Sequence, residues 1–154
     1  MAELGWNYRL PDILCALGIS QLKKLERFWR RRTEIAQSYD RLLAPFAPIV
    51  RPVARNSEAH GFHLYAVLID FAALGSSRAR FMKALLARGI GTQVHYIPVH
   101  LQPYYRQSNA GMLLAGAEGY YSRCLSLPIF PLMADEDVQR VAKAIAEIVG
   151  VALD

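Results

Sequence analysis

The sequence predicts an α+β domain in which helices pack on a small antiparallel or mixed sheet. Short apolar segments of strand length alternate with helical segments, in the order α-β-α-β-α-β-α, along 154 residues. A chain of this length buries roughly two-thirds of the surface that its unfolded form exposes, which is enough for one core. We therefore expect a single domain with its helices packed on one side of the sheet.

The first predicted element is a long helix over residues 11–44. Pro11 suits the first helical turn, where its missing N–H is not needed, and Asp12 places a negative charge near the positive end of the helix dipole. Apolar residues recur mostly at intervals of three and four, at Leu14, Leu17, Leu22, Leu25, Phe28 or Trp29, Ile35, Tyr39 and Leu42. This stripe of about nine turns exceeds what one small domain covers. We expect the helix to brace a second domain or subunit.

Shorter elements follow a proline-rich stretch at 45–52, where prolines end the helix and hold the backbone extended. Ser76 or Ser77 can cap one of the helices, Gly89 can stop it, and Asp135 can cap the last helix. The predicted elements are a strand at 63–70, a helix at 78–88, a strand at 91–97, a helix at 114–123, a strand at 124–128, and a final helix that starts beyond Asp135.

Composition excludes several classes of protein. A hydrophobic fraction of 53% and a charged fraction of 20% are typical of a globular domain and not of a disordered chain. The two cysteines lie far apart and no secretory signal is recognisable, so we expect a reduced, cytoplasmic protein. Apolar runs such as 65–69 are too short to cross a bilayer, and we expect no membrane span.

Basic residues gather at 23–32, and the net charge is +5. On a helix these cations spread around more than one face, and Glu26 and Glu34 are close enough to pair with them. A nucleic-acid interface requires a coherent basic face. The pattern favours a solvated helix face and no nucleic acid partner.

Four histidines offer an incomplete set of metal ligands. His60 and His63 are three residues apart, and His95 and His100 are five apart, but no cysteine or HExxH pattern accompanies them. The sequence therefore predicts no metal site.

Residues 95–105 form the segment richest in polar aromatic side chains. Two prolines stiffen it, and His95, Tyr96 and His100 supply donors, acceptors and flat faces suited to a polyhydroxylated ring. The residues alone are equally compatible with a ligand loop and a subunit contact.

Residues 5–9 directly precede the long helix. The amide of Asn7 and the guanidinium of Arg9 suit phosphate oxygens near the positive end of a helix. By local chemistry alone, a capping and packing role is favoured.

Four blocks of the sequence resemble the DegT/StrS group of pyridoxal phosphate (PLP)-dependent nucleotide-sugar aminotransferases. Residues 3–13 and 16–22 are similar to the family pattern GxNYR(L/M)xxxxAALGxxQL, with Cys15 in place of a small residue. Residues 63–65, 89–105 and 125–131 match in order and spacing. The resemblance covers essentially all 154 residues. The block at 89–105 is most similar to the transaminase of the pseudaminic acid pathway.

The resemblance implies the small C-terminal domain of a fold type I aminotransferase, within a homodimer. It divides residues 1–154 into an active-site segment at 1–10, an interdomain helix at 11–44 and a small α/β domain at 45–154. It also implies that Asn7 and Arg9 contact PLP, and that Tyr8, His95, Tyr96 and His100 face the nucleotide-sugar.

The reaction implied is transfer of an amino group from an amino acid, glutamate, to a nucleotide-linked 4-keto-6-deoxy sugar in surface polysaccharide or glycan biosynthesis. The resemblance implies that the family's PLP-binding large domain and Schiff-base lysine lie outside these residues. The four lysines here occur in helical patterns and not in a comparable setting. We therefore expect no catalytic residue, no bound cofactor and no activity in this chain alone. The alternative is a stand-alone, non-catalytic domain that binds a protein partner or a nucleotide-sugar.

Overall fold

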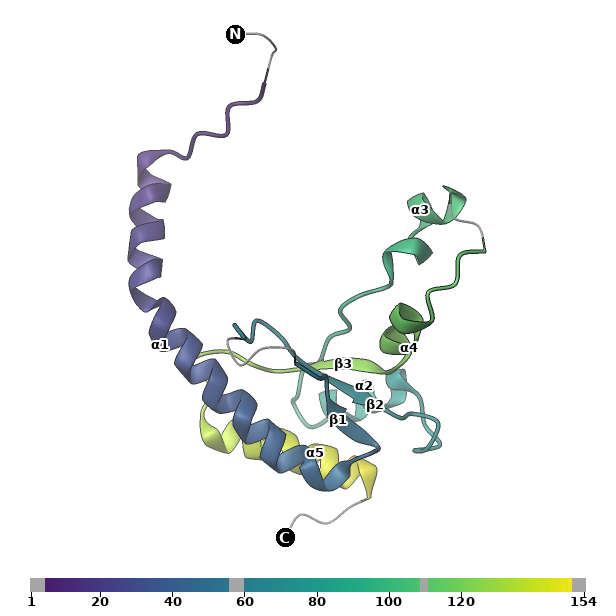
Figure 1. Cartoon of the computed structure of the whole chain (residues 1–154). Helices are drawn as coiled ribbons and strands as arrows, with labels where there is room; N and C mark the ends of the chain where they lie inside the picture. The colour runs from purple at the N-terminus through teal and green to yellow at the C-terminus, as the bar shows by residue number, and fades with distance from the viewer. Residues whose placement is uncertain (1–4, 56–59, 109–110, 151–154) are drawn as a thin grey trace.

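The computed structural model describes residues 5–55, 60–108 and 111–150. Residues 1–4 of the predicted active-site segment lie outside the described residues. The elements are α1 (Asp12–Leu43), η1 (Ala44–Phe46), β1 (Val50–Pro52), β2 (Tyr65–Ile69), α2 (Arg78–Leu86), η2 (Val99–Leu101), α3 (Pro103–Ser108), α4 (Ala115–Arg123), β3 (Cys124–Leu127) and α5 (Asp135–Val149). The predicted α+β fold is confirmed, with a long helix and further helices around a small antiparallel sheet (Figure 1).

The sheet has the order β1-β2-β3, and both strand pairs are antiparallel. Val67 in the central strand is the partner of Pro52 on one side and of Leu125 on the other. Alternate residues of β2 are buried, whereas all four residues of β3 are. The sequence did not predict β1, which pairs at an edge with its proline at the last position, where a missing N–H is tolerated.

The strand predicted at 91–97 is wrong. Only Gln93 pairs there, through an isolated bridge to Ser126 with backbone N···O distances of 3.2 and 2.8 Å. Gly91 before this bridge and Pro98 after it both weaken strand pairing. The segment therefore touches the sheet at one point and continues into the region of η2 and α3.

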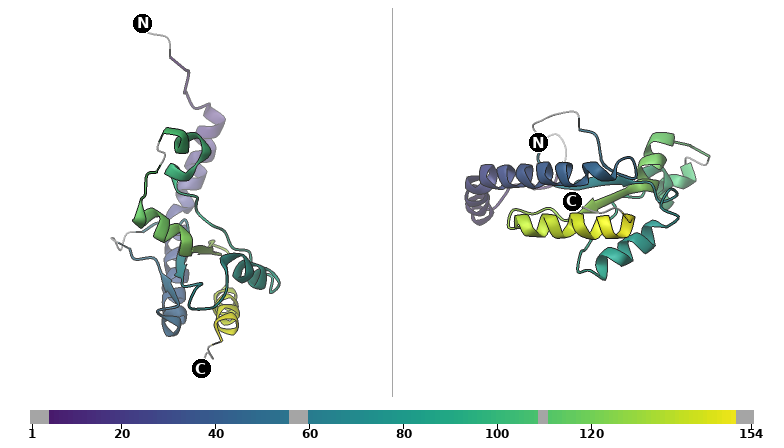
Figure 2. Two further views of the ribbon diagram at one scale, coloured as in Figure 1. Left: turned by 90° about the vertical axis from the view of Figure 1, so that its right-hand side faces the viewer. Right: turned by 90° about the horizontal axis from the view of Figure 1, so that it is seen from below.

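The core lies where the C-terminal half of α1 and the helix α5 pack against the sheet (Figure 2). Tyr39 of α1 is fully buried, as are Val67 of β2 and Ile145 of α5. Ser77 caps α2 as predicted, since its Oγ accepts a hydrogen bond from the Arg80 N–H at 3.3 Å. These contacts leave the N-terminal half of α1 outside the core.

The prediction that Asp135 caps α5 is wrong. Ala134 is the N-cap residue, and Asp137 accepts a hydrogen bond from the Ala134 N–H at 3.1 Å. Asp135 instead lies in the first turn, where its carboxylate pairs with Arg31 at 2.7 Å. The third helical residue reaches back to the cap more readily than the first.

Two parts of the chain project from the same side of the sheet, as Figures 1 and 2 show. One is the N-terminal half of α1 with the extended segment before it. The other, which we call the arm, comprises residues 96–107 and 111–123 and carries η2, α3 and α4. The apolar stripe of α1 is exposed over its first half at Ile13, Leu14, Leu17, Leu22 and Leu25.

Candidate functional site

The segment before α1 presents its polar side chains to solvent. Asn7, Tyr8 and Arg9 are all exposed, Tyr8 at 87%. The Asn7 Oδ1 accepts a hydrogen bond from the Arg9 N–H at 3.0 Å, which holds the carboxamide beside the backbone. The amide oxygen is thereby engaged locally, and the Asn7 NH₂ group is the part that can donate to an anion.

His95 lies at the edge of the sheet, where the chain leaves its bridge to β3. Its Nδ1 is 2.8 Å from the Oγ of Ser126, a buried residue of β3. The ring of Tyr96 meets the imidazole edge-on with 4.6 Å between centroids, and Tyr96 is 72% exposed. Because Ser126 occupies Nδ1, the imidazole has a fixed orientation, and Nε2 is the nitrogen that a ligand can contact.

His100, in η2, has a different environment from His95 and Tyr96. It is only 7% exposed, and its Nε2 lies 3.1 Å from the Oε1 of Glu118 in α4. The Leu114 N–H donates to the same carboxylate oxygen at 3.0 Å. These hydrogen bonds, first that of Leu114 and then that of His100, lower the pKa of Glu118.

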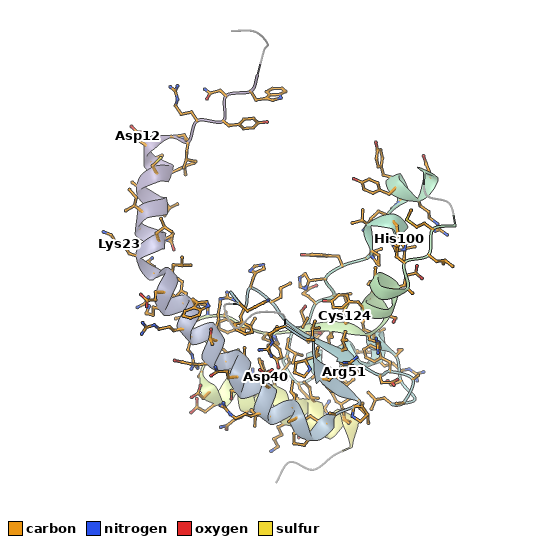
Figure 3. The ribbon with its side chains drawn as sticks, in the orientation of Figure 1. Asp12, Lys23, Asp40, Arg51, His100 and Cys124 are labelled. Atoms are coloured by element: carbon orange, nitrogen blue, oxygen red, sulfur yellow. The ribbon has the colours of Figure 1, made fainter. Side chains whose placement is uncertain are left out.

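The predicted site residues therefore fall into two groups, one on the segment before α1 and the other at the sheet edge and on the arm that follows it. Figure 3 labels Asp12 at the base of the N-terminal segment and His100 on the arm, and the two lie far from each other. Among the described residues, no hydrogen bond joins 5–10 to the arm. The segment 5–10 and the arm do not form one closed site within this chain.

The basic cluster on α1 has a structural role in part. Arg31 donates to the Met133 carbonyl at 2.6 Å, and Arg32 donates to the carbonyls of Phe62 at 2.8 Å and Ile129 at 3.1 Å. Arg30 instead pairs with Glu26 on the exposed surface. The cations thus divide between loop attachment and solvent, as expected for basic residues that spread around more than one face of the helix.

His60 and His63 line a surface pocket of about 410 Å³ together with Arg55, Tyr65 and Tyr120. His60 is engaged locally, with its Nδ1 3.0 Å from the Phe62 N–H. Within the described ranges, no group of three histidine, cysteine, aspartate or glutamate side chains could hold a metal ion. No helix in that part of the chain is long and apolar enough to span a membrane.

The sequence did not indicate Ser126 or Glu118 as members of the site. A hydroxyl within the buried strand at 124–127 is a usable signal, because a buried polar group requires a partner. Glu118 carries no comparable signal, since it is an ordinary acid in the first turn of a helix.

Comparisons with known proteins agree on one family. The model of the DegT/DnrJ/EryC1/StrS aminotransferase family matches residues 1–146. An uncharacterized protein of Methanocaldococcus jannaschii, MJ1066, is 39% identical over 150 residues, which are 96% of this chain and 39% of that protein.

Solved structures give the same result. Helicobacter pylori PseC, an aminotransferase of pseudaminic acid biosynthesis, superposes with a TM-score of 0.86 at 32% identity, over 96% of this chain and 40% of PseC. The aminotransferase TlmJ of Streptoalloteichus hindustanus superposes with a TM-score of 0.82 at 28% identity, over 97% of this chain and 39% of TlmJ. The chain spans about two-fifths of the length of these relatives. It belongs to the DegT/DnrJ/EryC1/StrS aminotransferase family.

Proposed function

We propose that this chain is the C-terminal portion of a PLP-dependent sugar aminotransferase. The reaction transfers an amino group, with glutamate as donor, to a nucleotide-linked 4-keto-6-deoxy sugar for surface polysaccharide or glycan biosynthesis. The observation that carries this proposal is the match to PseC over almost the whole chain. The proposed setting is the cytoplasm.

On the cofactor side, the residues before α1 fit a phosphate group. The Asn7 NH₂ and the Arg9 guanidinium are exposed donors, and they precede a helix whose N-terminal dipole favours an anion. PLP would supply the electron sink for amino transfer. Asn7 and Arg9 would bind its phosphate and so orient it.

On the substrate side, His95 and Tyr96 offer an imidazole and a phenol on an edge that is open to solvent. Ser126 fixes the imidazole, so its Nε2 can donate to or accept from a sugar hydroxyl without first losing rotational freedom. Tyr96, and Tyr8 from the N-terminal segment, would add flat faces and hydroxyls for the nucleotide-sugar.

The exposed stripe of α1 supports a homodimer in which each site takes residues from two chains. Leu17, Leu22 and Leu25 are more than half exposed. Contiguous apolar faces of this kind mark contacts with other chains or domains. The separation of Asn7 from His95 within one chain is compatible with sites shared between subunits.

The chain alone should not catalyse transamination. Its lysines all lie on helices, with Lys23 and Lys24 on α1, Lys83 on α2 and Lys143 on α5. None of them lies beside Asn7 or His95 in the sequence. The reaction needs a lysine that holds the cofactor and moves the proton between carbons.

The test is to express the chain both by itself and with whatever coding sequence precedes it in frame. Each product is incubated with PLP, trapped with borohydride and assayed with glutamate and nucleotide-linked 4-keto-6-deoxy sugars. We expect stoichiometric trapping and amino transfer only from an extended product. If every product binds the nucleotide-sugar and none turns it over, the chain is instead a stand-alone binding domain. Turnover by the 154-residue chain would refute the proposal that this chain is inactive by itself.

A further inference from the structure

The arm is unusual because almost nothing in it is buried. Val99 is 65% exposed, Tyr104 81% and Leu113 82%. Within residues 96–107 and 111–123, His100 is the single residue that is buried. The arm therefore has a polar side chain where a folded segment normally has an apolar one.

His100 connects the outgoing and returning limbs of the arm. It belongs to η2, and the Glu118 that it contacts at 3.1 Å belongs to α4, 18 residues further along the chain. The same Glu118 oxygen accepts the Leu114 N–H, which precedes α4. One carboxylate thus holds both the His100 ring and the backbone that begins the returning limb.

Only the His100 side of this pair is buried, since the Glu118 side chain is 36% exposed. Removal of Glu118 leaves the His100 imidazole without a partner in a low dielectric, whereas removal of His100 leaves a carboxylate that water can reach and that no longer has a fixed position. Because the arm has so little apolar packing, few contacts other than this pair favour one arrangement of the two limbs over another.

We propose that His100 and Glu118 form a latch that fixes the two limbs of the arm, and that His100 is a positioning residue and does not contact the substrate. The latch holds the limb that begins at Tyr96 in one conformation. Its consequence for turnover rests on the proposed function, whereas its effect on the arm does not.

Amide hydrogen exchange in the 154-residue chain tests the latch without cofactor or substrate. We expect His100→Ala to accelerate exchange of the Leu114 amide about tenfold. His100 does not contact that amide directly, so the change must pass through Glu118. His100→Gln retains a donor and should restore much of the protection, while β2 amides should exchange at the wild-type rate in all variants.

Glu147→Ala is the matched control, because Glu147 lies on α5 and pairs there with a side chain outside the arm, Arg88, at 3.1 Å. This variant should leave arm exchange unchanged. The arm amides of Gln102 and Arg106, which hydrogen-bond to the Val99 and Gln102 carbonyls, should exchange equally fast in Glu118→Ala, His100→Ala and the double variant. The latch would be refuted if the Leu114 amide of His100→Ala exchanged at the wild-type rate. It would also be refuted if the increase in the exchange rate of the Gln102 and Arg106 amides in the double variant were the product of the increases in the two single variants.

The catalytic consequence is tested separately in an extended, active product. His100→Ala and Glu118→Ala should lower kcat/KM by a similar factor of about ten. A loss with His100→Ala alone, with Glu118→Ala at the wild-type value, would assign His100 to the substrate and refute its positioning role. If no product is active, the proposed function fails while the exchange result stands.

Discussion

The Nη1 of Arg32 lies 2.8 Å from the carbonyl oxygen of Phe62, a residue whose φ is 44°. Positive φ is disfavoured for a bulky side chain, so the surrounding structure must hold this conformation. Arg32 also reaches the Ile129 carbonyl at 3.1 Å. One guanidinium therefore attaches two separate loops to α1.

We predict that Arg32→Ala destabilises the chain by about 2–3 kcal/mol, because charged hydrogen bonds to the carbonyls of Phe62, His63 and Ile129 are lost. Arg32→Lys should recover only part of this loss, since an ammonium lacks the planar fork. Urea unfolding measures both. Arg30→Ala, at an exposed pair with Glu26, is the control, and a loss no larger than that of the control would contradict the role of Arg32.

Tyr39 and Tyr65 should make the fold sensitive to alkali. Both are buried, and burial is the main cause that raises the pKa of each well above its ordinary value of about 10. Below that value both are protonated in either state. As pH rises above about 10, the unfolded chain ionises first, so stability is lost progressively.

We expect tyrosinate absorbance from these two residues to rise together with loss of circular dichroism. The Tyr39→Phe variant loses the hydrogen bond to the Pro128 carbonyl and about 0.5–1.5 kcal/mol at neutral pH, but its stability should fall less steeply with pH. Ionisation of both tyrosines in a fully folded chain would contradict this explanation.

In an extended, PLP-binding product, Asn7→Ala should raise the PLP dissociation constant. Loss of one hydrogen bond costs about 0.5–1.5 kcal/mol, and up to about 3 kcal/mol when the partner is charged, as a phosphate is. Titration of the apo protein with PLP measures the constant. Unchanged PLP affinity in Asn7→Ala would remove Asn7 from the cofactor side.

His95→Ala and Tyr96→Phe should instead raise the substrate KM or lower kcat, with PLP affinity intact. Ser126→Ala should reproduce part of the His95→Ala effect, because it releases the imidazole without removing it. Steady-state kinetics and PLP titration of each variant separate the two sides. Loss of cofactor in the His95 or Tyr96 variants would reverse our assignment.

The exposed stripe of α1 should drive self-association of the chain. Leu25 is 60% exposed, and Leu25→Glu places a charge within the apolar face, so sedimentation should show weaker association. Arg30→Glu alters charge on the same helix without touching the stripe and should weaken association less. A clean monomer at high concentration for the wild-type chain would exclude this role of the stripe.

Local patterns predicted much of the fold. Periodicity located α1 and α5, because each carries its apolar residues along one face, and an apolar run located β2. The pattern did not reveal β1, which is three residues long and contains a proline. It suggested a strand at 91–97 because Val94 and Ile97 lie among β-forming residues, although only Gln93 finds a partner.

The site was less accessible to sequence reasoning, since its contacts join distant positions. His95 and Ser126 are 31 residues apart, and Arg32 and Ile129 are 97 apart. Residue type alone suggested His100 as a ligand group as readily as His95. Only the burial of His100 against Glu118 distinguishes the two histidines.

The burial of a single histidine in the arm has a consequence for how such a protein diversifies. Replacement of an outward residue such as Val99, Tyr104 or Leu113 empties no core, and loops of this kind tolerate change more readily than packed elements. Mutation can therefore sample new surfaces on the arm while His100 and Glu118 stay constant. Selection for a different ligand then acts on positions where substitution changes the stability of the domain little.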